Sequence, residues 1–256
     1  MPAGRFLLPD TPLVAGDQLV LPEDAAHQVR DVLRLSTGDE IHLLDGSGYE
    51  YSATVVTCER KRVEVRVGAS SRGQAEPQAR IVLCQGVLKA AKYEWVLQKG
   101  TELGVAEFVP LLTERAVGAM EETSETKRRR WSRIVAEAIE QCGGTRMPVL
   151  AAPKPLMHAL AALPRDAIAL IPWEEADATP LVPALRRAVS ERAVRGVYLF
   201  VGPEGGFSAR EIALAQRHGA LPVTLGPRIL RAETAAIVAA TLALAALGEL
   251  DAAPRH

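Results

Sequence analysis

Apolar and polar positions alternate in short stretches along the first part of the chain. DEIHLLDG, YEYSATVV and RVEVRVG, all before residue 68, alternate apolar with polar residues or cluster β-branched ones, and glycine and aspartate turns bound them. This pattern is typical of β-strands. We therefore expect a small β-barrel-like domain over residues 1–72.

One helix is expected among these strands. Pro22 and two acidic residues form a helix-start signature, and four apolar residues follow at helical spacing: Ala26, Val29, Val32 and Leu33. His27, Arg30 and Arg34 are spaced three and four residues apart, so they are expected to share the opposite face. A basic helix face can contact phosphates, although an ordinary solvated face explains the same spacing.

The pattern changes after a small, polar segment that predicts a linker at residues 73–80. Strands are then expected at 81–87, 106–111, 167–171, 196–201 and 221–225, and helices at 93–103, 127–142, 209–218 and 233–247. Alternating strands and helices favour a parallel sheet covered by helices. We expect this α/β domain over residues 81–250.

Composition narrows the class of protein. The three cysteines, Cys58, Cys84 and Cys142, lie far apart without metal-ligand spacing, so reduced thiols and no metal are expected. The longest small-apolar stretch, residues 235–247, is shorter than a membrane span of about 18 residues, which predicts a cytoplasmic protein without a membrane partner. A net charge of −1 argues against coating nucleic acid through global positive charge, but not against reading one RNA site.

The segment GPEGGFS, residues 202–208, directly follows the apolar strand GVYLFV. Ser208 can cap the next helix, with Glu211 at the capping-box position. Loops at the carboxyl ends of parallel strands are where α/β proteins bind ligands, and glycines let the backbone approach a ligand closely. A tight strand-to-helix turn alone explains the segment equally well, and it is neither GxGxxG nor a Walker loop.

The segment LGPRILRAETA, residues 225–235, joins a short predicted strand to the last helix. Its Arg231 and Glu233 can orient a polar substrate, or the segment can simply start the helix. Five scattered histidines form neither a Ser-His-Asp set nor a thiol–histidine pair, so hydrolysis and metal chemistry have little support.

Together the two segments resemble the closing motifs of the SPOUT methyltransferase superfamily, and within it the RsmE family, the 16S rRNA (uracil(1498)-N3)-methyltransferases. Three further blocks match that family in order: HQVRDVLRLSTGDEIHLLDGSG, KYEWVLQKGTELGVAEFVPLLTERA and RRRWSRIVAEAIEQCGGTRMP. The departures are the variable stretch 142–145 and Ala232, which stands where a hydroxyl residue is common. Neither departure changes the glycines, Arg231 or Glu233.

The resemblance implies a PUA-like RNA-binding domain followed by a SPOUT α/β domain with a trefoil knot, a topology that pattern alone cannot reveal. The knot's loops are expected to hold S-adenosylmethionine, through main-chain groups and an apolar adenine slot. The residues implied in this pocket are Leu170, Ile171, Pro172, Gly202, Pro203, Glu204, Gly205, Leu225, Gly226, Ile229 and Leu230.

The implied reaction is methylation of uracil N3, whose neutral form has no available lone pair. Arg231 is expected to stabilise negative charge on a uracil carbonyl, and Glu233 to accept the proton or to hold Arg231 in place. The alternative is that Arg231 binds only a phosphate or the cofactor's carboxylate.

The implied partners are 16S rRNA or the small ribosomal subunit and a second copy of the chain. Arg5, His27, Arg30, Arg34 and Arg115 are the candidate RNA contacts. The last helix and residues 131–142 can supply an apolar dimer contact, or can simply cover the sheet.

Three other functions compete with this interpretation. The chain could methylate a different nucleoside, such as a ribose 2′-hydroxyl, or could bind RNA without catalysis, although the intact glycines, Arg231 and Glu233 speak against decay. A dehydrogenase is disfavoured because GxGxxG and its acidic partner are absent.

Overall fold

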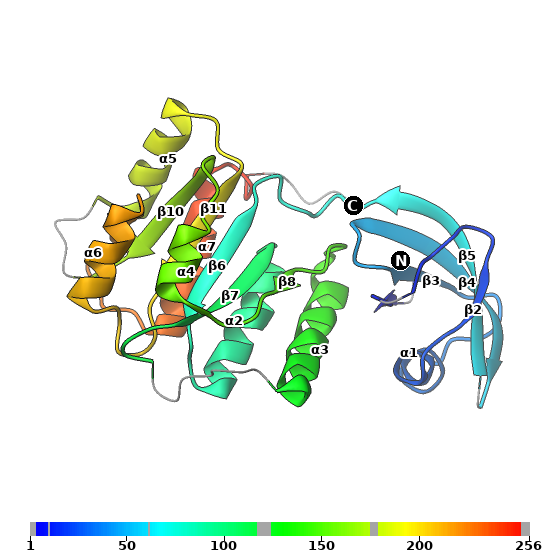
Figure 1. Cartoon of the computed structure of the whole chain (residues 1–256). Coiled ribbons are helices and arrows are strands. Elements are labelled where there is room, and N and C mark those ends of the chain that lie inside the picture. The colour runs from blue at the N-terminus through cyan, green and yellow to red at the C-terminus, as the bar shows by residue number, and fades with distance from the viewer. Residues whose placement is uncertain (1–3, 10, 61, 117–123, 175–178, 252–256) are drawn as a thin grey trace. The chain divides into compact units, whose positions relative to one another are not determined.

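The computed structural model describes residues 4–9, 11–60, 62–116, 124–174 and 179–251 (Figure 1). These form two compact units. The first comprises the described residues of Met1–Glu76 together with Ala136–Met147, and the second comprises those of Pro77–Val135 and Pro148–Pro254. The chain therefore leaves the first unit, returns to it and leaves it again.

The first unit is built on a five-stranded sheet in the order β1-β3-β4-β5-β2. Its strands are β1 (Arg5–Leu7), β2 (Gln18–Val20), β3 (Glu40–Leu44), β4 (Tyr49–Glu59) and β5 (Arg62–Arg72). β1 pairs with β3 in parallel, and the other pairs are antiparallel. Alternate residues such as Ile41, Leu43, Val63 and Val65 are fully buried, as expected of a sheet with one face in the core. The β-rich first domain is confirmed.

The helix of this unit differs from the prediction. α1 (Glu23–His27) continues directly into a π-helical turn, η1 (Gln28–Val32), in which the Leu33 N–H donates to the Gln28 carbonyl. The wider turn changes the spacing, so Val29 is buried while Val32 is 62% and Leu33 41% exposed. The prediction of one continuous apolar face is therefore wrong beyond Val29.

The second unit contains a seven-stranded parallel sheet in the order β12-β10-β11-β6-β7-β8, with β9 also paired to β7. The strands are β6 (Ile81–Gly86), β7 (Glu107–Leu112), β8 (Val149–Leu150), β9 (Lys154–Pro155), β10 (Ala167–Pro172), β11 (Gly196–Val201) and β12 (Leu221–Val223). Every residue of the central β6 is buried, the state that helices on both faces impose on a parallel strand.

The helices are α2 (Ala90–Glu102), α3 (Glu125–Cys142), α4 (Leu156–Ala161), α5 (Leu181–Glu191), α6 (Ala209–Arg217) and α7 (Ala232–Ala246). α7 packs on α2, α5, β6 and β11, whereas α4 and α6 pack together in a separate apolar cluster with the sheet (Figure 1). The predicted helix-covered parallel sheet is confirmed; the passage of the chain through a trefoil knot stays a prediction. No helix in the described ranges combines the length and apolarity needed to cross a membrane.

Residues 73–80 form neither helix nor strand, yet they are not a free tether. The Glu76 carboxylate accepts a hydrogen bond from the Arg146 N–H at 2.9 Å, within the first unit. The N–H groups of Gln78 and Ala79 donate to the Glu249 carboxylate at 3.0 and 2.7 Å, within the second. The segment is thus anchored on both sides of the division at residues 76 and 77.

Candidate active site

Three of the loops singled out in the sequence leave the same edge of the parallel sheet. β10 lies between β11 and β12, with Leu170 opposite both Leu199 and Leu221. Because these strands are parallel, residues 170–172, 202–205 and 225–230 all gather at their carboxyl ends. This is the edge where open α/β sheets bind ligands.

The loop at 202–206 packs directly on the end of β6. A Cβ added to Gly86 would lie 2.5 Å from the backbone nitrogen of Pro203, so only glycine fits there. The fully buried Gln85 donates through Nε2 to the carbonyls of Gly86 and Gly202, both at 3.0 Å. Sequence reasoning missed Gln85, although a polar residue near the end of an otherwise apolar strand was a usable signal.

The loop after β7 lies against the same segment. Arg115 donates through Nη1 to the carbonyl of Gly205 at 3.1 Å. Glu211 accepts from the Glu114 N–H at 2.9 Å and from the Ser208 N–H at 2.8 Å, while the Ser208 hydroxyl accepts from the Glu211 N–H. The predicted capping box is confirmed, and the same carboxylate also holds the β7 loop.

Replacing Glu211 with Ala is expected to lower the free energy of unfolding by about 1–2 kcal/mol, because the Ser208 and Glu114 N–H groups both lose their carboxylate acceptor. Urea unfolding measures the change. Glu211→Gln keeps one acceptor oxygen and should lose less. Equal stability of Glu211→Ala and the parent protein would contradict the double role.

The loop after β12 is open to solvent. Gly226 has φ +113°, a left-handed conformation that side chains rarely adopt, and its N–H donates to the Thr224 hydroxyl at 3.1 Å. Ile229 is 83% exposed, whereas Leu170 and Ile171 have no exposed surface. The two buried residues therefore present no side chain to a ligand, and the Ile229 side chain is open to solvent.

Arg231 and Glu233 stand at the start of α7. Arg231 is the exposed N-cap residue, and its guanidinium makes no hydrogen bond or ion pair with the described residues. Glu233 is not paired with it: the nearest cation is Lys92 of α2, whose Nζ lies 3.7 Å from Glu233 Oε2 and 3.2 Å from Glu204 Oε1. The idea that Glu233 holds Arg231 is thus wrong, and Lys92 is a residue that sequence reasoning missed.

The Glu204 side chain of the GPEGG loop is held as a carboxylate by groups at the start of α2. Burial raises the pKa of Glu204, but hydrogen bonds from its own N–H, from the Lys92 ammonium and from the Lys89 N–H outweigh burial and lower the pKa overall. The acidic member of the GPEGG motif therefore ties this loop to α2.

The candidate RNA contacts in the first unit are partly engaged within the chain. Arg5 forms an ion pair with Glu50 at 2.9 Å and donates to the carbonyl of Gly144 at 3.1 Å. Glu50 is only partly exposed, so this arginine has a structural role as well. Its contact with RNA stays a prediction.

The expected basic helix face carries an acidic residue at its centre. Asp31 Oδ2 lies 2.7 Å from both His27 Nδ1 and Arg30 Nη2. Hydrogen bonds from Arg30 and then from His27 lower the pKa of Asp31. Arg34 is not on this face, because the helix ends at Val32 and Arg34 adopts φ +56°. The shared face predicted for the three basic residues is therefore wrong for Arg34.

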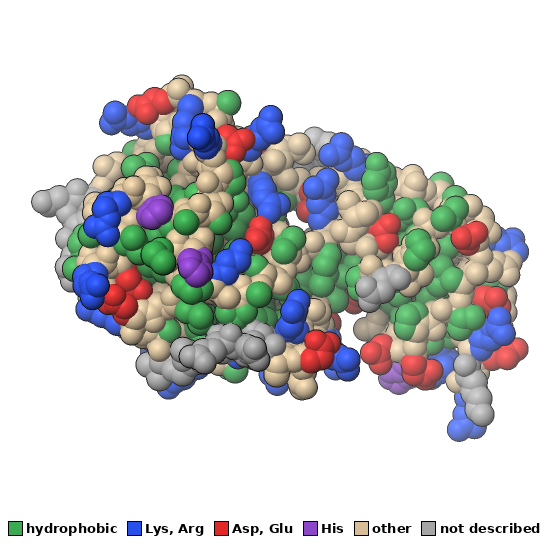
Figure 2. Space-filling view, viewed as in Figure 1, with side chains coloured by type: hydrophobic (Ala, Val, Ile, Leu, Met, Phe, Trp, Pro, Cys, Tyr) green, Lys and Arg blue, Asp and Glu red, His purple; other side chains and the backbone are tan. Residues whose placement is uncertain are grey.

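Charged side chains of both signs are also mixed on the face of the molecule shown in Figure 2. In Figure 2, Lys and Arg side chains are interspersed with Asp and Glu over the face shown, without one uninterrupted basic surface. On this face, recognition of RNA would thus depend on individual cations, not on a broad positive field.

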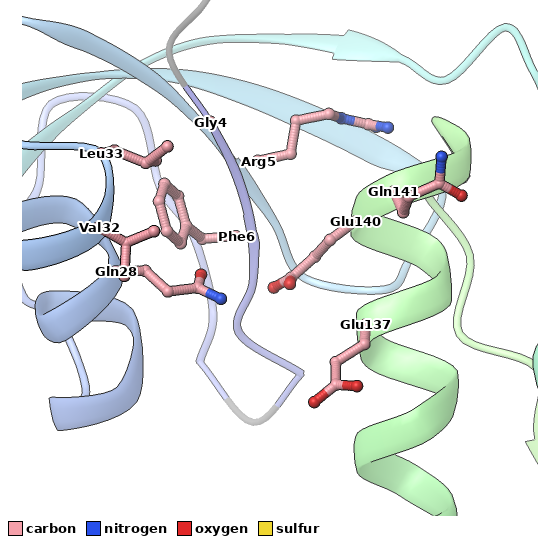
Figure 3. Close-up of a pocket in the computed structure, with 9 residues that line it drawn as sticks. All are labelled: Gly4, Arg5, Phe6, Gln28, Val32, Leu33, Glu137, Glu140 and Gln141. Atoms are coloured by element: carbon pink, nitrogen blue, oxygen red, sulfur yellow. The ribbon is translucent and has the colours of Figure 1, made fainter.

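A hollow in the first unit lies between β1 and the second half of α3 (Figure 3). Its lining residues are Gly4, Arg5, Phe6, Gln28, Val32, Leu33, Glu137, Glu140 and Gln141. None of the predicted cofactor residues is among them. Burial raises the pKa of Glu140, which accepts a hydrogen bond from the Leu7 N–H at 2.7 Å. Two acidic residues make the hollow a poor site for phosphate.

Two known domain families match this architecture. The RNA methyltransferase domain matches residues 74–244, and the RNA methyltransferase PUA domain matches residues 21–68. The fold and the clustered loops therefore belong to an RNA methyltransferase domain that carries a PUA domain at its amino-terminal side.

Similarity to individual proteins identifies the family. The chain is 32% identical to the ribosomal RNA small subunit methyltransferase E of Synechocystis sp., over 93% of this chain and 78% of that protein. It is 31% identical to the Mycobacterium bovis protein of the same name, over 91% and 86%. The chain belongs to the ribosomal RNA small subunit methyltransferase E family, and the resemblance to the RsmE family is confirmed.

Solved structures of similar proteins support this assignment. The Neisseria gonorrhoeae ribosomal RNA small subunit methyltransferase E bound to S-adenosyl methionine has a TM-score of 0.83 and 31% identity, and the match covers 96% of this chain and 97% of that chain. A putative methyltransferase from Legionella pneumophila in complex with SAM has a TM-score of 0.76 and 32% identity, covering 94% and 97%.

Proposed function

We propose that this protein transfers a methyl group from S-adenosylmethionine to N3 of a uridine in 16S rRNA, at position 1498 of the family's designation. Family membership supports the reaction class, and the two structural neighbours bound to this cofactor support its use here. The observation that carries the proposal is the gathering of three loops at one sheet edge beside Arg231, which has no ion pair with the described residues.

The residues at this edge fit the cofactor. Residues 202–206 lack side-chain bulk at three positions, so a ligand can approach this backbone closely, while the Gly202 and Gly205 carbonyls already accept hydrogen bonds from Gln85 and Arg115. Glu233 Oε2 is buried without a hydrogen-bond partner, which leaves an acceptor for a bound molecule. The proposed binding set is residues 170–172, 202–205, 225, 226, 229 and 230, with Leu170 and Ile171 acting through their main chain.

When bound, the cofactor supplies an electrophilic methyl group on a sulfonium. Glu233 accepts the N3 proton of the uracil, N3 forms the bond to the methyl carbon, and the carbon–sulfur bond breaks to leave a neutral thioether. Arg231 stabilises the negative charge that spreads onto a uracil carbonyl. The target base has to be unstacked, since N3 is inaccessible inside a paired helix.

The direct test is incubation of the purified protein with methyl-labelled S-adenosylmethionine and either free 16S rRNA or small subunits that lack the modification. Nucleoside mass spectrometry should show 3-methyluridine. A labelled 2′-O-methyl nucleoside instead would support the second candidate target. Calorimetric binding of the cofactor without any transfer would support a non-catalytic RNA-binding protein.

The PUA domain implies an RNA surface in the first unit, and Arg34 is its sharpest candidate because it is exposed without an ion pair in the described chain. Arg34→Ala is expected to weaken rRNA binding and to reduce the salt dependence, d log K/d log[salt], by about 1. Arg34→Gly should weaken binding equally while raising stability by about 1 kcal/mol, because glycine adopts φ +56° without strain. Retained binding in both variants would contradict the contact.

A homodimer in the cytoplasm completes the proposal. The apolar face of α3 is occupied within the chain, since Trp131, Val135 and Ile139 are buried. α7, by contrast, keeps Ile237, Val238 and Leu242 only half-buried, and Ile229 stands exposed in the loop before it. These residues favour α7 as the contact, and sedimentation equilibrium tests it.

A further inference from the structure

Lys92 occupies a junction between the segments that build the proposed active site. It lies in the first turn of α2, and its side chain is one-third exposed. Its ammonium lies 3.2 Å from Glu204 of the GPEGG loop and 3.7 Å from Glu233 of α7. One cation thus faces carboxylates from two segments that are far apart in the sequence.

We infer that Lys92 is a positioning residue for methyl transfer: it aims the Glu233 carboxylate and fixes the GPEGG loop against α7. The inference rests on the proposed function, in which Glu233 accepts the N3 proton. Two carboxylates facing one another would repel, and the shared ammonium replaces this repulsion with attraction.

The distances from the Lys92 ammonium to Glu204 and to Glu233 indicate two different roles. At 3.2 Å, Lys92 and Glu204 are within hydrogen-bonding distance, which anchors the loop. At 3.7 Å, Lys92 acts on Glu233 through its charge without occupying the oxygen, and Glu233 Oε2 is buried with no hydrogen-bond partner. Lys92 therefore sets the direction of the Glu233 carboxylate while the lone pair of Oε2 stays available for a proton.

Few other charges face Glu233. Of the elements packed on α7, β6 and β11 contain no charged residue, and α7 itself contains only Glu233. The charged residues of α5 are Arg186, Arg187 and Glu191, and the last two pair with each other. In α2, Lys99 pairs with Glu102 and Glu94 with Arg130. The remaining charges are Arg186 of α5, Lys92 with its partner Glu204, the exposed Lys89 just before α2, and Arg231 beside Glu233 in sequence.

Lys92→Met should therefore change chemistry more than fold. Loss of the ammonium leaves Glu233 without the cation that aims it, so kcat should fall while the KM for rRNA stays at its parental value. Misplacement of Glu233 and the loop should lower kcat by about tenfold to a hundredfold. Steady-state kinetics on the rRNA substrate, with circular dichroism as a check of folding, measure both effects.

Three variants sharpen the comparison. Lys89→Met removes an exposed cation from the start of the same helix and should leave kcat and KM unchanged. Lys92→Arg retains the charge and should keep most of the parental kcat, including if Lys92→Met folds poorly. Glu204→Gln weakens only the loop link, so it should raise the Kd for S-adenosylmethionine in calorimetry with a smaller loss of kcat than Lys92→Met.

The outcomes separate this inference from the function on which it rests. An inactive Glu233→Gln variant together with a parental kcat in Lys92→Met would overturn the role of Lys92 alone. Full activity of Glu233→Gln would overturn the proton-acceptor assignment and the inference with it. In the double variant Lys92→Met/Glu233→Gln, the two losses should not add, because both act on one proton transfer.

Discussion

Replacing Arg231 with Ala is expected to reduce kcat by about a hundredfold to a thousandfold, equivalent to about 2.7–4 kcal/mol of transition-state stabilisation. The guanidinium is exposed at the start of α7 and makes no ion pair within the described chain, so its charge is available to a substrate. S-adenosylmethionine affinity should be unchanged, because the residue acts on the uracil. Single-turnover kinetics and calorimetry measure the two quantities.

The matched control is Arg217→Ala, which removes another exposed arginine from the last turn of α6. Its kcat should equal that of the parent. A raised KM for rRNA with unchanged kcat in Arg231→Ala would instead assign Arg231 to phosphate binding, and a weakened cofactor would assign it to the cofactor's carboxylate.

Replacing Gly86 with Ala should weaken binding of the cofactor, although Gly86 lies outside the recognised motifs. The new methyl group would lie 2.5 Å from the Pro203 nitrogen and 2.9 Å from the Gly202 carbonyl carbon, both backbone atoms, so the loop has to move. Overpacking of this kind costs about 1–3 kcal/mol, and the Kd for S-adenosylmethionine should rise by about tenfold to a hundredfold.

Gly196→Ala is the control, because it makes the same substitution in neighbouring β11. There the nearest non-adjacent atom to the new Cβ is Tyr198 Cε2 at 3.5 Å, an ordinary contact. Its cofactor affinity should match the parent. If Gly86→Ala also binds normally, the close packing of the loop on β6 is not needed for binding.

Local signals predicted those features that depend on neighbours in the sequence. The bounds of β11 match the expected 196–201, and the capping box of Ser208 and Glu211 is present as expected. Parallel strands also placed the two glycine-bearing loops at one edge, because that consequence needs only strand direction.

Long-range packing explains what the sequence did not reveal. Lys92 and Gln85 acquire their roles from Glu204 and Gly202, more than a hundred residues away, and no local spacing encodes such contacts. α4 and α5 were not predicted either. Pro183 lies in the first turn of α5, where its missing N–H has no helical partner to lose, so a proline that suggests a break is tolerated.

Neither unit corresponds to one uninterrupted stretch of the amino-acid sequence. The second half of α3 supplies Glu140, which binds the Leu7 N–H, and the segment after it supplies the Gly144 carbonyl that Arg5 binds. A fragment cut at residue 72 would retain every strand of the first sheet but lose both partners. A transplanted PUA domain would therefore need residues 136–147 as well as the strands of its sheet to keep these contacts.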